Sequence, residues 1–122
     1  MPAMGSFSVK IAPYVATELA LAREAERAGR HDDGFKHLER AHVLGQASTV
    51  QHVRVHWRML CWGLRHHQPR EVAGQLLRLV GAATKTAIGL LPEGNTGGAN
   101  VSAVKPMPVP DDLAEILRSA RA

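Results

Sequence analysis

Two histidines, His52 and His56, stand four residues apart in the stretch 48–65, and Met59 follows three residues later. Side chains at spacings of three and four share one face of an α-helix, so both imidazoles and the thioether would point the same way. Neutral imidazole is the commonest metal ligand, and histidines at i and i+4 bind one ion from one face. The pattern therefore favours a transition-metal site on this helix.

A third histidine, His42, precedes a turn centred near residues 46 and 47 and would lie level with residues 51 and 52 of the next helix. In the same hairpin His37 would lie level with His56, so four imidazoles could gather along one helix pair. A thioether ligand favours Cu(I), whereas an all-imidazole set suits Zn(II), Ni(II) or Cu(II). We expect a site for one of these metals made of His42, His52, His56 and Met59.

Other interpretations of the same residues stay open. His52 and His56 could be buried polar groups that hydrogen-bond to the backbone or to each other. Catalytic signatures such as HExxH, CxxC and GxSxG are absent, and the glycine-rich run 94–98 lacks the lysine of a phosphate-binding loop. Cys61 lies about 140° from His56 on a helical wheel, which favours a buried, inert thiol. We expect a binding protein rather than an enzyme.

The helix that would carry these residues, predicted over 48–65, is apolar around most of its circumference. Its broad apolar stripe consists of Val50, Val53, Trp57, Leu60, Cys61 and Leu64. A helix with so wide an apolar surface is normally packed on several sides. We therefore expect a central helix, surrounded on nearly every side, that holds its imidazoles inside the protein.

Further helices are predicted over 13–28, 32–45 and 69–91, because apolar residues recur there at helical spacing between turn residues. Connections of only a few residues make successive helices antiparallel neighbours. The sequence thus predicts an all-α fold, a four-helix bundle-like or helical-hairpin arrangement, in a single domain over 1–122. Residues 1–11 are expected to be a loose N-terminal arm.

The stretch 92–110 is rich in proline and glycine and shows no helical or alternating period. It also carries several apolar side chains, which a mere linker would not need. We expect it to lie extended along the helices and to lead into a short helix over 111–120.

Composition narrows the class of protein. With 45% hydrophobic and 21% charged residues, the chain resembles an ordinary globular domain. A net charge of +4 is mild, so nucleic acid is not the expected partner, although Arg54, Arg58 and Arg65 follow one another at helical spacing. One cysteine, no secretory-signal pattern and no run of 18 apolar residues favour a cytoplasmic location without membrane contact.

Two segments resemble the marks of a known family. They are LERAHVLGQ, residues 38–46, and GNTGGANVSAVKPMPVPDDL, residues 94–113. Both resemble a family of short bacterial proteins known only as a domain of unknown function. The resemblance implies a bacterial cytoplasmic protein of one domain and carries no established activity. Because His42 and the 95–100 loop lie in these motifs, a pocket is expected where the loop meets the end of the second predicted helix.

The first two predicted helices also resemble a tetratricopeptide hairpin. Small and apolar residues, Ala22, Gly29, Leu38 and Ala41, follow at spacings of seven, nine and three. The aromatic residue expected near the start is absent, and Gly34 replaces the usual alanine. A repeat array needs about three units, so one imperfect unit indicates only a similar hairpin. The alternative function is an adaptor that binds another protein or a second copy of the chain.

Overall fold

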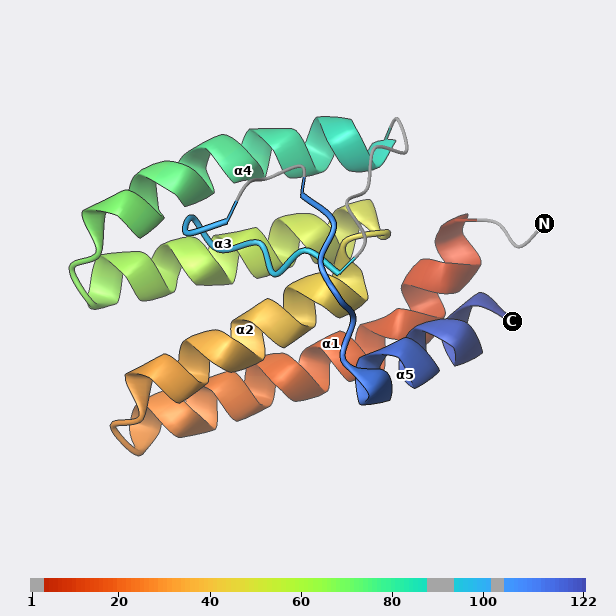
Figure 1. The fold of residues 1–122 in the computed structure, drawn as a ribbon, viewed down its shortest axis with the longest axis horizontal. Helices are drawn as coiled ribbons and strands as arrows, with labels where there is room; N and C mark the ends of the chain where they lie inside the picture. The colour runs from red at the N-terminus through yellow and green to blue at the C-terminus, as the bar shows by residue number, and fades with distance from the viewer. Residues whose placement is uncertain (1–3, 88–93, 102–104) are drawn as a thin grey trace.

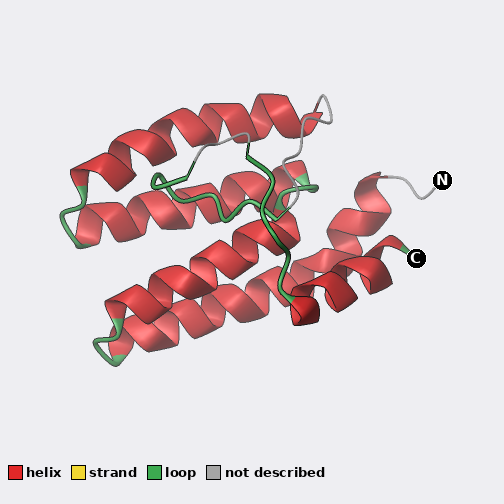
Figure 2. Cartoon of the chain, viewed as in Figure 1, coloured by secondary structure: helices red, strands yellow, loops and turns green. Residues whose placement is uncertain are grey.

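The computed structural model describes residues 4–87, 94–101 and 105–122, and these residues form five α-helices and no strand (Figures 1 and 2). The helices are α1 (Met4–Arg27), α2 (His31–Gly45), α3 (Thr49–Arg65), α4 (Pro69–Ala87) and α5 (Asp111–Arg121). The predicted all-α fold with a short final helix is confirmed. The predicted end of α4 near residues 90 and 91 lies outside the described residues.

Two helical hairpins build the bundle. α1 packs against α2 and α3 packs against α4, while contacts between α2 and α3 join the two pairs (Figure 1). α5 lies against α1 and α2, where Leu113, Leu117 and Ala120 enter the hydrophobic core. None of the described helices is long and apolar enough to cross a membrane.

The prediction of a loose N-terminal arm is wrong for the residues that the structure describes. α1 already begins at Met4, and Pro13 lies inside it instead of in its first turn. Phe7 and Ile11 are buried on the same face as Val15, at successive spacings of four. Burial of these apolar side chains offsets the backbone hydrogen bond that a proline inside a helix removes.

The buried face of α3 also differs from the predicted apolar stripe. Val50, Trp57 and Leu64 are exposed, at 70%, 56% and 58%. Of the predicted stripe the helix buries Leu60, and its buried face otherwise carries His52, Val55, His56, Met59 and Trp62. α3 is therefore not surrounded on nearly every side, but the arc that carries its imidazoles does face the interior.

The segment 94–101 has no regular secondary structure and fastens α2 to α4 (Figures 1 and 2). The Asn95 carbonyl oxygen meets His42 of α2, while Gln75 of α4 donates to the Gly97 carbonyl. Arg78 of α4 donates to the Val101 carbonyl. The predicted extended segment 92–110 thus contacts the histidines through Asn95 and Gly97, which lie against His42.

Candidate metal centre

Three buried histidines bring their Nε2 atoms together at the contact between α2 and α3. The Nε2 atoms of His42, His52 and His56 form a triangle with all three sides 3.1 Å long. Their side chains are almost completely buried, with exposed fractions of 3%, 7% and 2%. Sequence spacing thus correctly placed these three imidazoles side by side.

The helical hairpin explains how one histidine of α2 meets two of α3. His52 and His56 lie one turn apart on the same face of α3, and His42 lies one turn before the end of α2. Gly45 ends α2 in close contact with α3, because a Cβ atom at this position would lie 3.0 Å from the Cβ of Gln51. A larger residue would push the two helices apart at the level of the triangle.

The hydrogen bond of His42 fixes its tautomer. Nδ1 of His42 lies 2.7 Å from the carbonyl oxygen of Asn95. A carbonyl oxygen only accepts, so Nδ1 carries the hydrogen and Nε2 presents a lone pair to the triangle. Gly97 allows this arrangement, because a Cβ there would lie 2.4 Å from Cδ2 of His42.

His56 is oriented in the same way by Gln75. Nδ1 of His56 lies 2.5 Å from Oε1 of Gln75. Nε2 of Gln75 donates to the Gly97 carbonyl at 2.9 Å and to Glu71 at 2.6 Å, so the amide oxygen must face the imidazole. Nδ1 of His56 is therefore the donor, and its Nε2 also turns a lone pair toward the centre.

Burial keeps the imidazoles of His42 and His56 neutral, because it lowers the pKa of both. It lowers the pKa of His42 well below the usual value, and the neighbouring His56 and His52 lower that pKa further. Burial also lowers the pKa of His56 to about 4, against the opposing effect of its bond to Gln75. At neutral pH the lone pairs of His42 and His56 thus face each other at 3.1 Å, with no proton of their own between them.

The triangle has the size that a small metal ion requires. Nitrogens 3.1 Å apart suit metal–nitrogen bonds of about 2.05 Å if the ion lies about 1 Å out of their plane, with N–metal–N angles of about 98°. These angles lie between the octahedral value of about 90° and the tetrahedral value of about 109°, and they leave the outer side of the ion open for further ligands. Such a facial set of three imidazoles suits Zn(II), Ni(II) or Cu(II).

Met59 and His37 do not join the triangle in the same way. Met59 is fully buried one turn beyond His56 and belongs to the hydrophobic core, and its thioether as a fourth ligand stays a prediction. The idea of a fourth imidazole is wrong, because Nδ1 of His37 bonds to Oε2 of Glu18 on α1 at 2.9 Å. His42 is five positions after His37, which turns the two side chains about 140° apart around α2.

The residues that support the histidines were only partly foreseen. Asn95 belongs to a motif that was singled out, but Gln75 was not. Gln75 is completely buried. In the sequence it is recognisable only as a polar residue between apolar neighbours of the predicted helix. Glu71, one turn earlier on α4, holds Gln75 and also accepts from the Ala99 backbone N–H.

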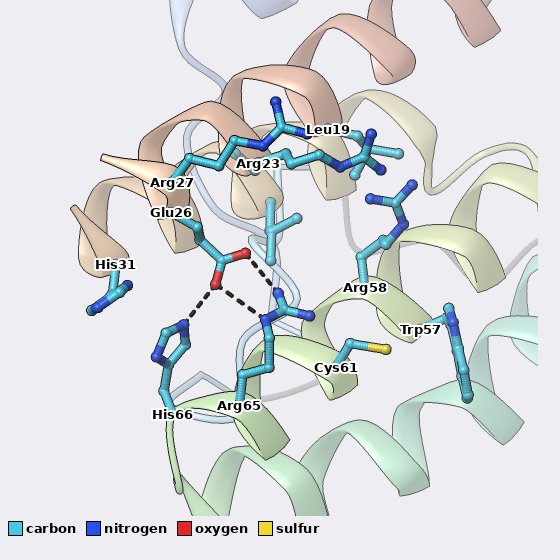
Figure 3. Close-up of a pocket in the computed structure, with 12 residues that line it drawn as sticks. Leu19, Arg23, Glu26, Arg27, His31, Trp57, Arg58, Cys61, Arg65 and His66 are labelled. Carbon is cyan, nitrogen blue, oxygen red and sulfur yellow. Dashed lines mark hydrogen bonds and ion pairs between the residues drawn. The ribbon is translucent and has the colours of Figure 1, made fainter. Parts of the chain in front are cut away.

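A second group of possible ligands lies at the far ends of α1 and α3 (Figure 3). Oε1 of Glu26 lies 2.6 Å from Nε2 of His66, and the ring of His31 lies against that of His66 at a tilt of 40°. Burial would raise the pKa of Glu26, but hydrogen bonds from His66 and Arg65 lower it below the usual value. The Arg65 guanidinium occupies this carboxylate at 2.6 Å and would repel a cation, so the buried triangle is the better metal site.

A family model described as "Protein of unknown function (DUF3703)" matches residues 9–117. The chain belongs to this family. The matched region of the DUF3703 family contains the three histidines of the triangle together with Gln75 and Asn95. No curated protein and no solved structure matches the chain.

Proposed function

We propose that the protein binds one transition-metal ion through the Nε2 atoms of His42, His52 and His56. The observation that carries this proposal is the triangle of buried nitrogens, 3.1 Å on each side. Metal-binding histidines characteristically donate their other ring N–H to a carbonyl or similar acceptor, which fixes the tautomer. His42 and His56 have this arrangement through Asn95 and Gln75.

The alternative is a purely structural triad linked by hydrogen bonds. One proton on Nε2 of His52 could be shared with His42 or His56, but the lone pairs of His42 and His56 would still face each other. A metal ion between the three nitrogens satisfies all of them at once. This arrangement of nitrogens therefore favours a bound ion over a purely structural triad. The two possibilities predict different results when metal binding is measured directly.

Titration of chelator-treated protein with Zn(II), Ni(II) and Cu(II), followed by calorimetry, tests the proposal. We expect a stoichiometry of one ion per chain. The double variant His52→Ala, His56→Ala should lose at least 100-fold in affinity for the preferred ion, since two of three ligands are gone. Unchanged affinity in this variant would refute the site.

Two controls keep the result interpretable. His37→Ala removes a histidine that faces Glu18 on α1, so its metal affinity should match the wild type. Co(II) loading of the wild type gives an independent readout, because a tetrahedral nitrogen site produces strong visible absorption that octahedral aqueous Co(II) lacks. A spectrum identical to that of aqueous Co(II) would count against the triangle even if the double variant failed to fold.

The adaptor function remains a second candidate because the outer surface of the α3–α4 hairpin is apolar. Leu64 of α3 and Leu76 of α4 line a shallow groove of about 570 Å³ between these helices. Leu77 and Val80 on α4 are also exposed, at 77% and 68%. Under this proposal, Leu77→Glu should abolish self-association or partner binding in sedimentation experiments without changing metal affinity.

A further inference from the structure

A basic groove runs between α1 and α3, well away from the histidine triangle. It has a volume of about 590 Å³ and is lined by four arginines, Arg23, Arg27, Arg58 and Arg65, with Glu26 as its single carboxylate. In Figure 3, Arg23 of α1 and Arg58 of α3 reach toward each other across this groove. The groove therefore concentrates positive charge from two helices.

The carboxylate in the groove is already occupied. Oε2 of Glu26 lies 2.6 Å from Arg65 and Oε1 lies 2.6 Å from His66 (Figure 3). Among the residues that the structure describes, no ion pair is made by the other three arginines, Arg23, Arg27 and Arg58. Three guanidinium groups thus face one groove without a counter-charge from the described chain.

The electrostatics of Arg58 reflect this crowding. Its guanidinium lies opposite that of Arg23 from α1, and Arg65 lines the same groove (Figure 3). Like charges held close together at a partly buried site destabilise the folded protein. A bound anion would remove this repulsion, so the arrangement favours an anionic ligand over an empty, solvated surface.

We propose that the groove between α1 and α3 binds a phosphoryl group through Arg23, Arg27 and Arg58. Guanidinium groups donate paired hydrogen bonds that match phosphate oxygens. Three uncompensated charges call for a ligand with more than one negative charge, and a phosphate monoester carries about −1.5 to −2 at pH 7. The groove is larger than one phosphate ion, so it has room for a small phosphate ester whose organic part lies against Leu19 and Trp57.

This site is separate from the metal centre. Arg58 lies two residues after His56, which places the two side chains about 160° apart around α3. The triangle lies toward α2 and segment 94–101, whereas the groove opens between α1 and α3. Failure of one proposal therefore leaves the other standing.

Calorimetric titration of the full chain with inorganic phosphate and with phenyl phosphate tests this inference. We expect saturable one-to-one binding of at least one probe. Tighter binding of phenyl phosphate would identify an ester as the ligand, and tighter binding of inorganic phosphate would identify the free ion. Arg23→Gln and Arg58→Gln should each weaken binding by about 10-fold or more, as expected for loss of a charge-assisted hydrogen bond.

Arg70→Gln is the matched control, because it removes the same charge from the exposed start of α4, outside the groove. Its phosphate affinity should stay within about twofold of the wild type. An equal loss in Arg70→Gln, or no binding of either probe at millimolar concentration, would overturn the proposal. Binding of a short DNA duplex alone would also overturn it, since it would make the arginines a nucleic-acid surface.

Discussion

At the scale of single residues, Gln75 determines which nitrogen of His56 is available to bind a metal ion. Its amide has only one orientation that satisfies Glu71, the Gly97 carbonyl and the imidazole together. This orientation determines the tautomer of His56 and turns its Nε2 toward the centre. Gln75 would not touch the metal itself, but it orients His56 as a metal ligand.

Gln75→Leu tests this role. The variant has a shorter, apolar side chain and loses the acceptor for Nδ1 of His56, so we expect metal affinity to fall about 10- to 100-fold. Calorimetric titration with Zn(II) measures the change. Gln68→Leu, in the exposed turn before α4, is the control and should bind like the wild type. Equal affinities in both variants would show that Gln75 does not orient the ligand.

The lowered pKa of His56 predicts how stability depends on pH. The imidazole of His56 has a pKa of 6.5 in the unfolded chain, and burial lowers this pKa to about 4 in the folded protein. Between these values the unfolded state binds more protons, so the free energy of unfolding decreases as pH falls, by about 1.4 kcal/mol per pH unit from His56 alone. His42, whose pKa is also lowered, acts in the same direction.

Urea unfolding of the metal-free protein at pH 7, 6 and 5 measures this dependence. The range stays above the pKa values of the paired carboxylates Glu26 and Asp112, which are lowered and contribute only in stronger acid. Burial raises the pKa of Glu39, which acts in the opposite direction, so the measurement is made on Glu39→Gln. A constant free energy of unfolding from pH 7 to 5 in this variant would mean that the imidazoles accept protons in the folded state.

At the scale of elements, α1 shows what sequence patterns capture and what they miss. The helix itself was predicted, but its start was placed at Pro13 because a proline suits a first turn. Phe7, Ile11 and Val15 pack in one hydrophobic core with residues of α2 and α5. The burial of these side chains outweighs the preference of proline for a first turn.

Phe7→Ala should therefore destabilise the protein substantially. Removing a buried phenyl ring from the core costs about 3 kcal/mol, measurable as a lower free energy of unfolding in urea. Val9→Ala is the control, because Val9 is 75% exposed on the same helix and its loss should cost less than about 0.5 kcal/mol. If both variants behave alike, the N-terminal turns of α1 are not part of the core.

The orientation of α3 also shows a limit of prediction from sequence patterns. A helical wheel ranks faces by hydrophobicity, so it chose the face of Val50, Trp57 and Leu64, which is exposed. The face that is buried carries His52 and His56. The Nδ1 atoms of His56 and of its neighbour His42 bond to Gln75 and Asn95, which come from distant parts of the chain. Spacing alone predicted that His42, His52 and His56 meet, but it held no information on these partners.

At the scale of the whole molecule, the triangle joins the two helical hairpins. His42 belongs to the α1–α2 pair and His52 and His56 to the α3–α4 pair. Segment 94–101 adds a second connection, since it bonds to both His42 and α4. An ion in the triangle would bind the folded arrangement and not the separated hairpins.

Metal should therefore stabilise the entire fold. At a free Zn(II) concentration 100 times the dissociation constant, the free energy of unfolding should rise by about 2.7 kcal/mol. Scanning calorimetry with and without Zn(II) measures the corresponding rise in the unfolding temperature. The His52→Ala, His56→Ala variant should show no rise. A rise of the same size in that variant would place the bound metal elsewhere.

The contact of Gly97 with the ring of His42 has a consequence for how an ion would reach the triangle. With the glycine backbone lying against the imidazole and all three rings buried, a fully hydrated ion is too large to approach the nitrogens. It must shed most of its water molecules on the way in. Ni(II) releases water far more slowly than Cu(II), so stopped-flow mixing should show slower loading with nickel, whichever ion is held more tightly at equilibrium.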